Sequence, residues 1–204
     1  MKAFSNKLYV FFFFFHKEGA CRLSVKGRSA TTITVKHGEL LMKDGRLEQG
    51  NINVYYHPEK KKEVFQMDVY TLKGTGKAEV FMPHFCYHGF QFVEIESTEP
   101  IELTEENLTG LFMHTDLKQV GQFSSSNELL NKIWAATNQA YRSNIHSIPT
   151  DCPQREKNGW TADAHVATDL ALLNFDGITL YEKWMNDFKD NQRDSIGDIS
   201  GIIP

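Results

Sequence analysis

This sequence has few cysteines, no excess of basic residues and no long hydrophobic run. The 204 residues include three cysteines, Cys21, Cys86 and Cys152, whose odd number and wide spacing argue against a disulfide framework. The 22 basic residues are outnumbered by 26 acidic ones, and both kinds are scattered. Because nucleic-acid-binding proteins carry clustered positive charge, no nucleic-acid partner is predicted. We also expect no cofactor.

No apolar stretch of the sequence approaches the roughly 20 residues of a membrane-spanning helix, so no membrane span is predicted. The longest run lies in "MKAFSNKLYVFFFFFHKEGAC", which has the lysines, apolar core and small residues of a signal peptide. The run is short for such a core, and His16, Lys17 and Glu18 occupy the place of a cleavage site. We favour a buried β-strand that continues into "CRLSVKG". A cytoplasmic and a periplasmic location both stay open.

The first half of the chain has the pattern of β-strands. Apolar and polar residues alternate in "TTITVKHGELL" and "EVFQMDVYTLKGTG", and an aromatic segment, "HFCYHGFQFVEIE", follows. The alternating apolar positions are Ile33 and Val35, then Phe65, Met67 and Val69. Residues 1 to about 115 are therefore predicted to form an antiparallel sheet or sandwich.

Further along the chain the apolar period changes to that of helices. The segment "SSSNELLNKIWAATNQAY" opens with a capping box of Ser125 and Glu128. Its apolar positions on one helical face are Leu129, Leu130, Ile133, Trp134 and Tyr141. Two more helical patterns follow, the first from Asp163 onward. We expect a multidomain chain, with a β-sandwich-like region at 1–120 and helices at 121–204.

The stretch "PTDCPQREKNGWTADA", residues 149–164, crowds charged and aromatic side chains between two helical patterns. These side chains are Asp151, Arg155, Glu156, Trp160 and Asp163. A carboxylate at a helix start can simply complement the dipole, and a surface ion pair contributes little. The density of the group favours a sugar site, which needs an aromatic face, acceptors for hydroxyls and a protonated carboxyl to donate to the leaving oxygen.

The same stretch resembles the catalytic loop of bacterial α-L-rhamnosidases of glycoside hydrolase family 78. The string Asp-Cys-Pro-Gln-Arg-Glu with a following Gly-Trp pair carries the resemblance. It extends, in the family's order, to "TVKHGELL", "YHGFQFVEI", "TDLKQVGQFSSSNELLNKIW" and "ALLNFDGITLYEKWMNDFKDNQ". The resemblance covers the chain from about residue 22. It implies the end of a β-sandwich domain followed by the first helices of an incomplete catalytic (α/α)6 barrel.

The resemblance also implies an activity, namely hydrolysis of terminal α-L-rhamnose from a glycoside or polysaccharide by an inverting acid/base mechanism. Glu156 matches the family's proton-donating glutamate. The residues matching those around the rhamnose ring are Asp151, Arg155, Trp160 and Asp163. Because the family's general base lies on a later barrel loop, we expect this chain to carry the acid without the base and to be inactive alone. The C-terminal "RDSIGDISGIIP" is a loose version of a family segment at the rim of the sugar site.

A different class of function stays open, that of a non-catalytic carbohydrate-binding or interaction fragment held by a partner. In either case, helices without the rest of a barrel would expose apolar faces, and these favour self-association.

Two sets of cysteine and histidine compete with the sugar site. The first is His84, Cys86 and His88, which would share one face of a strand and could bind zinc, although a fourth ligand is not evident and no metal is expected.

The second set pairs Cys152, as a thiol nucleophile, with His146 or His165 as its base. Neighbouring carboxylates disfavour the thiolate at this position, which argues against the pair.

Overall fold

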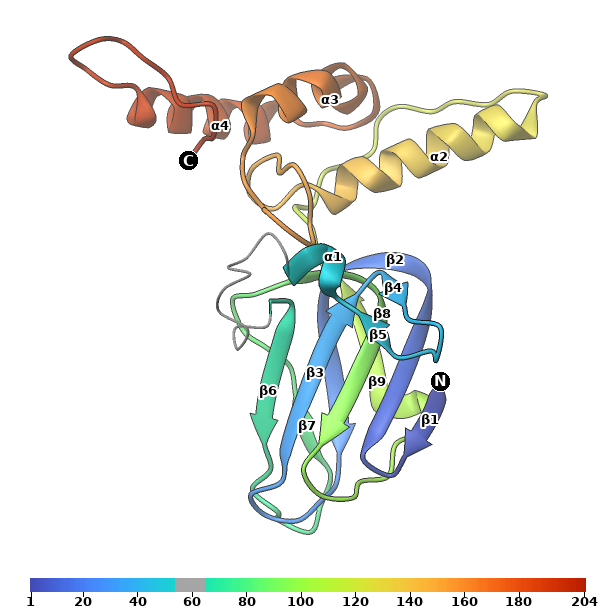
Figure 1. Cartoon of the computed structure of the whole chain (residues 1–204). Coiled ribbons are helices and arrows are strands. Elements are labelled where there is room, and N and C mark those ends of the chain that lie inside the picture. The colour runs from blue at the N-terminus through green and yellow to red at the C-terminus, as the bar shows by residue number, and fades with distance from the viewer. Residues whose placement is uncertain (54–64) are drawn as a thin grey trace. The chain divides into compact units, whose positions relative to one another are not determined.

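The computed structural model describes residues 1–53 and 65–204, without the side chains of residues 14–17 and 53. Its contacts divide the chain into two compact units, Met1–Met113 and His114–Pro204. The first unit is built mainly of strands and the second of helices (Figure 1). The predicted order of a β region followed by an α region is confirmed, and the contacts divide the chain a few residues before the predicted boundary.

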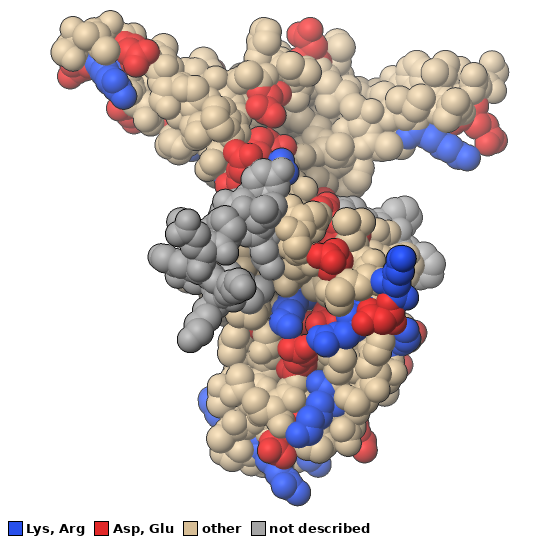
Figure 2. All heavy atoms as spheres, viewed as in Figure 1, with Lys and Arg blue, Asp and Glu red and all other residues tan. Residues whose placement is uncertain are grey.

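An antiparallel sheet of seven strands forms most of the first unit, as predicted. Its order is β1-β2-β8-β3-β6, β7 and β9 also pair with β2, and β4 and β5 form a separate ladder. The strands are β1 (Lys2–Ser5), β2 (Leu8–Val25), β3 (Thr32–Gly38), β4 (Leu40–Leu41), β5 (Leu47–Glu48), β6 (Met67–Thr71), β7 (Glu79–Phe81), β8 (His88–Ser97) and β9 (Leu108–Phe112). Helix α1 (Gly50–Asn53) and a 3₁₀ helix (Glu105–Asn107) lie between them. On the face of this unit seen in Figure 2, acidic and basic side chains are interleaved.

The phenylalanine run belongs to β2, an 18-residue strand that pairs with four others. Its register against β8 shifts between Phe12 and Lys17, which marks an irregularity in the ladder. Gly19 follows with φ of +151°, and a Cβ there would lie 1.9 Å from the Leu111 carbonyl oxygen. Only glycine therefore allows β9 to approach this closely. The prediction of a strand is confirmed, and Tyr9, Val10 and Phe11 are buried, whereas Phe12 is 48% exposed. Burial of Phe14 and Phe15 lies outside the described side chains.

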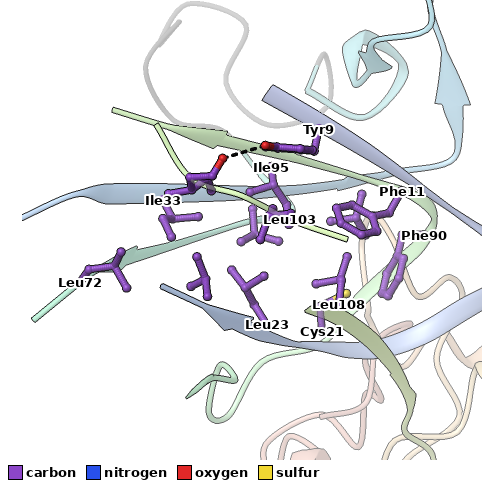
Figure 3. Packing of buried hydrophobic residues seen from close by; sticks show 14 residues of the cluster. Tyr9, Phe11, Cys21, Leu23, Ile33, Leu72, Phe90, Ile95, Leu103 and Leu108 are labelled. Carbon is purple, nitrogen blue, oxygen red and sulfur yellow. Dashed lines mark hydrogen bonds between the residues drawn. The ribbon is translucent and has the colours of Figure 1, made fainter. Parts of the chain in front are cut away.

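The core of the first unit lies between two layers of strands (Figure 3). Leu23 of β2 and Leu108 of β9 face Ile33 of β3 across it. The Tyr9 hydroxyl donates to the Ile101 carbonyl oxygen at 2.7 Å, so its polar end is satisfied inside the cluster. Burial of one large apolar side chain stabilises a fold by about 1.5–3 kcal/mol, and this cluster is what joins the layers.

Strand β6 does not bury the face that its apolar residues predicted. The opposite face points toward the core. Val69 is 52% exposed. Tyr70 instead packs against the core and stacks on Phe81, with ring centroids 4.8 Å apart. Asp68 shares the inward face and pairs with His88 of β8. Because a period of two does not tell which face is buried, polar partners decide the orientation here.

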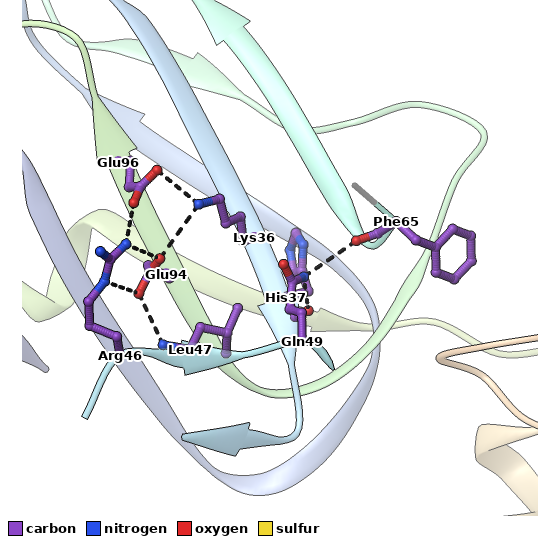
Figure 4. A network of polar contacts seen from close by, with 8 residues as sticks. All are labelled: Lys36, His37, Arg46, Leu47, Gln49, Phe65, Glu94 and Glu96. Atoms are coloured by element: carbon purple, nitrogen blue, oxygen red, sulfur yellow. Dashed lines mark hydrogen bonds and ion pairs between the residues drawn. The ribbon is translucent and has the colours of Figure 1, made fainter. Parts of the chain in front are cut away.

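A buried carboxylate, Glu94 of β8, ties the β4–β5 ladder to the main sheet (Figure 4). Arg46 donates to Glu94 through Nε and Nη2, at 3.2 and 2.9 Å, and also donates to Glu96. The Leu47 N–H donates to Glu94 at 3.0 Å, and Lys36 Nζ lies 3.7 Å from it. The buried charge is thus compensated by two cations and a backbone N–H, as burial of a carboxylate requires.

Three helices form the second unit: α2 (Glu128–Ser143), α3 (Thr161–Asn174) and α4 (Ile178–Asn191). The Asn127 side chain caps α2 by accepting from the Leu129 N–H at 2.9 Å. The predicted capping box is therefore wrong, because Ser125 accepts from the Asn127 N–H instead, just before the helix begins. No helix in the described ranges combines the length and apolar character needed to cross a membrane.

The helices of the second unit pack through two small apolar clusters. Tyr141 of α2 stacks on Phe175, which follows α3, with centroids 5.3 Å apart. The Trp134 indole N–H donates to Asn174 Oδ1 at 2.8 Å, and the second cluster contains Trp184 of α4. Three apolar residues of the predicted α2 face are exposed: Leu129, Leu130 and Ile133. This unit therefore buries only part of the apolar surface of its helices.

Candidate active site

The loop between α2 and α3 is folded back on itself by Asp151. The Asp151 N–H donates to the Asn158 carbonyl oxygen at 3.0 Å, and Asp151 Oδ1 accepts from the Asn158 N–H at 2.9 Å. Thr150 anchors the start of the loop, because its N–H and hydroxyl donate to the Asn144 carbonyl oxygen at 2.7 and 3.1 Å. Asp151 thus shapes the loop, and its partner Asn158 was not singled out from the sequence.

The Cys152 side chain links Asp151 to Glu156. Its thiol donates to Asp151 Oδ2 with an S···O distance of 2.7 Å, and its sulfur accepts from the Glu156 N–H at 3.3 Å. Burial, followed by the hydrogen bond to Asp151, raises the pKa of the Cys152 thiol, which therefore stays protonated at neutral pH. The hypothesis of a thiol nucleophile is wrong, since this thiol is a neutral donor to a carboxylate and His165 is exposed on α3.

Glu156 is held by the indole of Trp160. Trp160 Nε1–H donates to Glu156 Oε2 at 2.8 Å, and Arg155 Nε lies 4.0 Å from the other oxygen, Oε1. The side chains of Arg155 and Glu156 are 34% and 36% exposed. The carboxyl thus accepts a hydrogen bond at one oxygen and has the Arg155 guanidinium near the other, and its side chain is partly exposed.

The C-terminal residues hold this loop from a second side. The Ile203 N–H donates to the Gly159 carbonyl oxygen at 2.9 Å, and the Thr161 N–H donates to the Gly201 carbonyl oxygen at 2.9 Å. A Cβ on Gly159 would lie 1.8 Å from the Ile203 carbonyl oxygen, so a side chain does not fit there. The Trp184 indole donates to the same oxygen at 3.1 Å. The segment that the sequence places at the rim of the sugar site therefore supports the loop through its backbone.

Asp151 and Asp163 both line an open groove between α2 and α3, with a volume of about 570 Å³. Its walls also include Thr137, Tyr141, Ile145, Ala164, Ala167 and Leu170. Asp163 lies in the first turn of α3, where its charge complements the helix dipole. Arg155, Glu156 and Trp160 are not among the residues that line the groove. The structure thus brings the five predicted residues into two adjacent groups of one loop and the helix that follows.

The three residues weighed as an alternative metal set, His84, Cys86 and His88, do not share a strand face. Strand β8 begins only at His88, and Phe85 has φ of +60°, which interrupts the extended backbone before it. His84 is exposed. Cys86 and His88 both contact Asp68 of β6 instead: the Cys86 thiol lies 3.7 Å from Oδ1, and His88 Nε2 lies 3.0 Å from Oδ2.

Family models match both units of the chain. Residues 5–114 match the concanavalin-like domain of bacterial alpha-L-rhamnosidases, and residues 118–204 match their six-hairpin glycosidase domain. The chain belongs to the bacterial α-L-rhamnosidase family. The resemblance of the loop and its flanking segments to this family is therefore confirmed, as is the expected order of its two domains.

Individual α-L-rhamnosidases agree with this assignment. One from Streptomyces avermitilis is 33% identical over 187 residues, which are 91% of this chain and 17% of that protein. The solved structure of a rhamnosidase from Dictyoglumus thermophilum has a TM-score of 0.86 and 37% identity, and covers 100% of this chain and 22% of its own. The solved structure of the Streptomyces avermitilis enzyme complexed with L-rhamnose has a TM-score of 0.81 and 30% identity. The match covers 98% of this chain and 18% of that one. The chain thus spans about a fifth of the length of these relatives.

Proposed function

We propose that the chain is the acid-bearing part of an enzyme that hydrolyses terminal α-L-rhamnosides, with Glu156 as the general acid. Its family supports rhamnoside hydrolysis. The observation that carries the proposal is the hydrogen bond from Trp160 Nε1–H to Glu156 Oε2. Because Oε2 accepts this N–H, a proton on the carboxyl resides on Oε1, from which it can pass to the leaving oxygen of a glycoside.

The neighbouring side chains supply the contacts that a pyranose needs. Arg155, beside Glu156, offers several N–H donors for ring hydroxyls. Trp160 offers an apolar ring face for the C–H side of the sugar, and exposed Asp163 offers acceptors for hydroxyls. Asp151 has both carboxylate oxygens engaged within the loop, so we assign it first to holding Glu156 in place.

An inverting mechanism needs a second carboxylate as base, roughly 6.5–9.5 Å from the acid with a water between them. We place this base outside the 204 residues, on the rest of a six-hairpin domain. After Glu156 the sequence has one further glutamate, Glu182, which is exposed on α4 and fits a solvated helix position.

The test compares Glu156→Gln with the matched control Glu182→Gln in the full-length protein. The amide keeps the shape of the acid but has no proton to give, so turnover of an aryl α-L-rhamnoside should fall by several orders of magnitude while rhamnose affinity stays within about tenfold. Glu182→Gln should keep wild-type turnover. Proton NMR of the first product anomer tests inversion. Unchanged turnover in Glu156→Gln would remove this residue from the role.

A non-catalytic carbohydrate-binding role predicts another result in the same experiment. The wild-type full-length protein would bind rhamnose in calorimetry and release none from any rhamnoside supplied.

A further inference from the structure

A cluster of metal-ligating side chains lies in the first unit and has no part in the proposed glycosidase chemistry. His37 of β3, Asp68 of β6 and His88 of β8 each offer a ligand atom, and these atoms lie within 4.8 Å of one another. The three strands are neighbours in the sheet, in the order β8-β3-β6. The cluster is buried: His37 is 0% and His88 6% exposed, and the Asp68 side chain is 10% exposed.

Within residues 1–53 and 65–204, the ion-pair partner of the Asp68 carboxylate is His88, with Nε2 3.0 Å from Oδ2, and no lysine or arginine pairs with it. The Cys86 thiol lies 3.7 Å from Oδ1. A buried carboxylate is stable only when a positive charge or several hydrogen bonds compensate it, so this site favours a cation.

Hydrogen bonds from neighbouring groups orient the side chains of the cluster. In metal sites, such second contacts fix the orientation of each ligand. His37 Nδ1 lies 3.3 Å from the Gln66 carbonyl oxygen, which can only accept, so Nδ1 carries a proton and Nε2 is the nitrogen that would ligate a metal ion. The Gln66 amide also bonds Gly89, donating to its carbonyl oxygen at 2.6 Å and accepting from its N–H at 3.1 Å. Gln66 thereby fixes both His37 and the start of β8, where His88 lies.

We propose that His37, Asp68 and His88, with Cys86 as fourth ligand, bind one divalent transition-metal ion of the Zn²⁺ class. Two imidazoles, a carboxylate and a thiolate form a ligand set suited to tetrahedral zinc, whereas Ca²⁺ and Mg²⁺ prefer sites made of oxygen alone. On binding, the Cys86 thiol would lose its proton to solvent. The ion would also displace to solvent the proton between His88 Nε2 and Asp68, and His88 would ligate as the neutral ring protonated at Nδ1.

The histidine rings must move for this ion to bind. They are stacked, with centroids 4.1 Å apart and 21° between the ring planes, so their in-plane lone pairs do not point at one common position. Binding therefore requires one ring to turn until both lone pairs face the ion. The ion would then join β3, β6 and β8 to the loop that carries Cys86, which makes its role structural.

The test uses the purified full-length protein, stripped with a chelator and titrated with Zn²⁺. We expect one equivalent of zinc per chain by elemental analysis and a rise of several degrees in the thermal unfolding midpoint, since an ion that binds only the folded state stabilises it. Ca²⁺ and Mg²⁺ should leave the midpoint unchanged. Co²⁺ in place of zinc should give a thiolate-to-metal absorption band that is lost in Cys86→Ser.

Three variants separate the ion from a simple hydrogen-bond cluster. Asp68→Asn preserves shape and can still hydrogen-bond, yet it should lose the bound zinc, as should His88→Ala. The control is His84→Ala, which changes an exposed histidine two positions before Cys86 and should bind zinc like the wild type. Absence of a stoichiometric zinc effect in the wild type, or full zinc binding in both Asp68→Asn and His88→Ala, would overturn the proposal. Absence of the cobalt band in the wild type would overturn the assignment of Cys86.

Discussion

Trp160 and Glu156 act as one unit, because the indole N–H of Trp160 donates to Glu156 Oε2 at 2.8 Å. The two residues are four positions apart, and Trp160 directly precedes the first residue of α3. The aromatic ring that would contact a sugar therefore also orients the carboxyl that would protonate it. The two roles can be separated by substitution.

Replacing Trp160 by Phe removes the hydrogen bond and keeps most of the ring. We expect turnover of the full-length enzyme to fall about tenfold, as for the loss of one hydrogen bond, with little change in rhamnose affinity. Trp160→Ala also removes the ring and should weaken rhamnose binding by roughly 1–3 kcal/mol. Steady-state kinetics and calorimetry measure both effects. Wild-type turnover in Trp160→Phe would show that the hydrogen bond does not matter. Identical rhamnose affinity in the two variants would show that the ring makes no contact with the sugar, and unfolding of Trp160→Ala would show that the indole is structural.

Cys152 should be alkylated slowly at neutral pH. Because burial and the bond to Asp151 raise the pKa of its thiol, little thiolate is present at pH 7 and more forms only as the solution becomes alkaline. Asp151→Asn removes the negative charge beside the thiol and should accelerate labelling. Iodoacetamide labelling followed by mass spectrometry of the peptide gives the rates. Rapid labelling of the wild type at pH 7 would contradict the protonated thiol.

Gly159→Ala should destabilise the second unit, because the new Cβ would meet the Ile203 carbonyl oxygen at 1.8 Å. We expect a loss of roughly 1–3 kcal/mol in the free energy of unfolding, as for overpacking elsewhere. The matched control is Gly201→Ala, whose Cβ meets the Trp160 ring at an ordinary 3.8 Å. Urea unfolding compares the two. Equal stabilities would mean that the C-terminal segment does not hold the loop.

The 204-residue chain alone should hydrolyse no aryl α-L-rhamnoside and should self-associate. Exposed apolar side chains on α2 and α3, among them Ile133 (52% exposed) and Leu173 (74% exposed), leave surfaces that other helices of a six-hairpin domain would cover. Enzyme assay and light scattering test the two parts. Turnover that disappears in Glu156→Gln would show that this chain holds its own base.

The sequence predicted local structure correctly where one segment determines its own conformation. It did not predict which face of a strand is buried where residues far away in the sequence determine that. The Asp44-Gly45 pair by itself favours a turn, and the structure has one, since the Gly45 N–H donates to the Met42 carbonyl oxygen and Gly45 has positive φ. The face of β6 was not predictable, because Asp68 turns inward to partners such as His88 that lie far away in the sequence.

The candidate site shows the same division. Its five side chains were proposed from the local motif between Asp151 and Asp163, since they are close in sequence. Two further contacts were missed. Pairing of Ile203 with Gly159 joins residues 44 positions apart, and the cysteine that was weighed as a nucleophile turned out to brace the loop. A backbone pairing between residues so far apart leaves no pattern in the composition or in the spacing of apolar residues. The same holds for a cysteine whose role depends on its burial.

Strand β2 also has a consequence for synthesis on the ribosome. It is made before all but one of its partners, and β8 and β9, which flank it, end at Ser97 and Phe112. At about 5–20 residues per second, translation leaves the phenylalanine run without these neighbours for several seconds. During that interval the nascent chain exposes an apolar segment to which a chaperone can bind. The sheet can close only after Phe112 has left the exit tunnel, so a translational pause placed earlier than that would favour aggregation over folding.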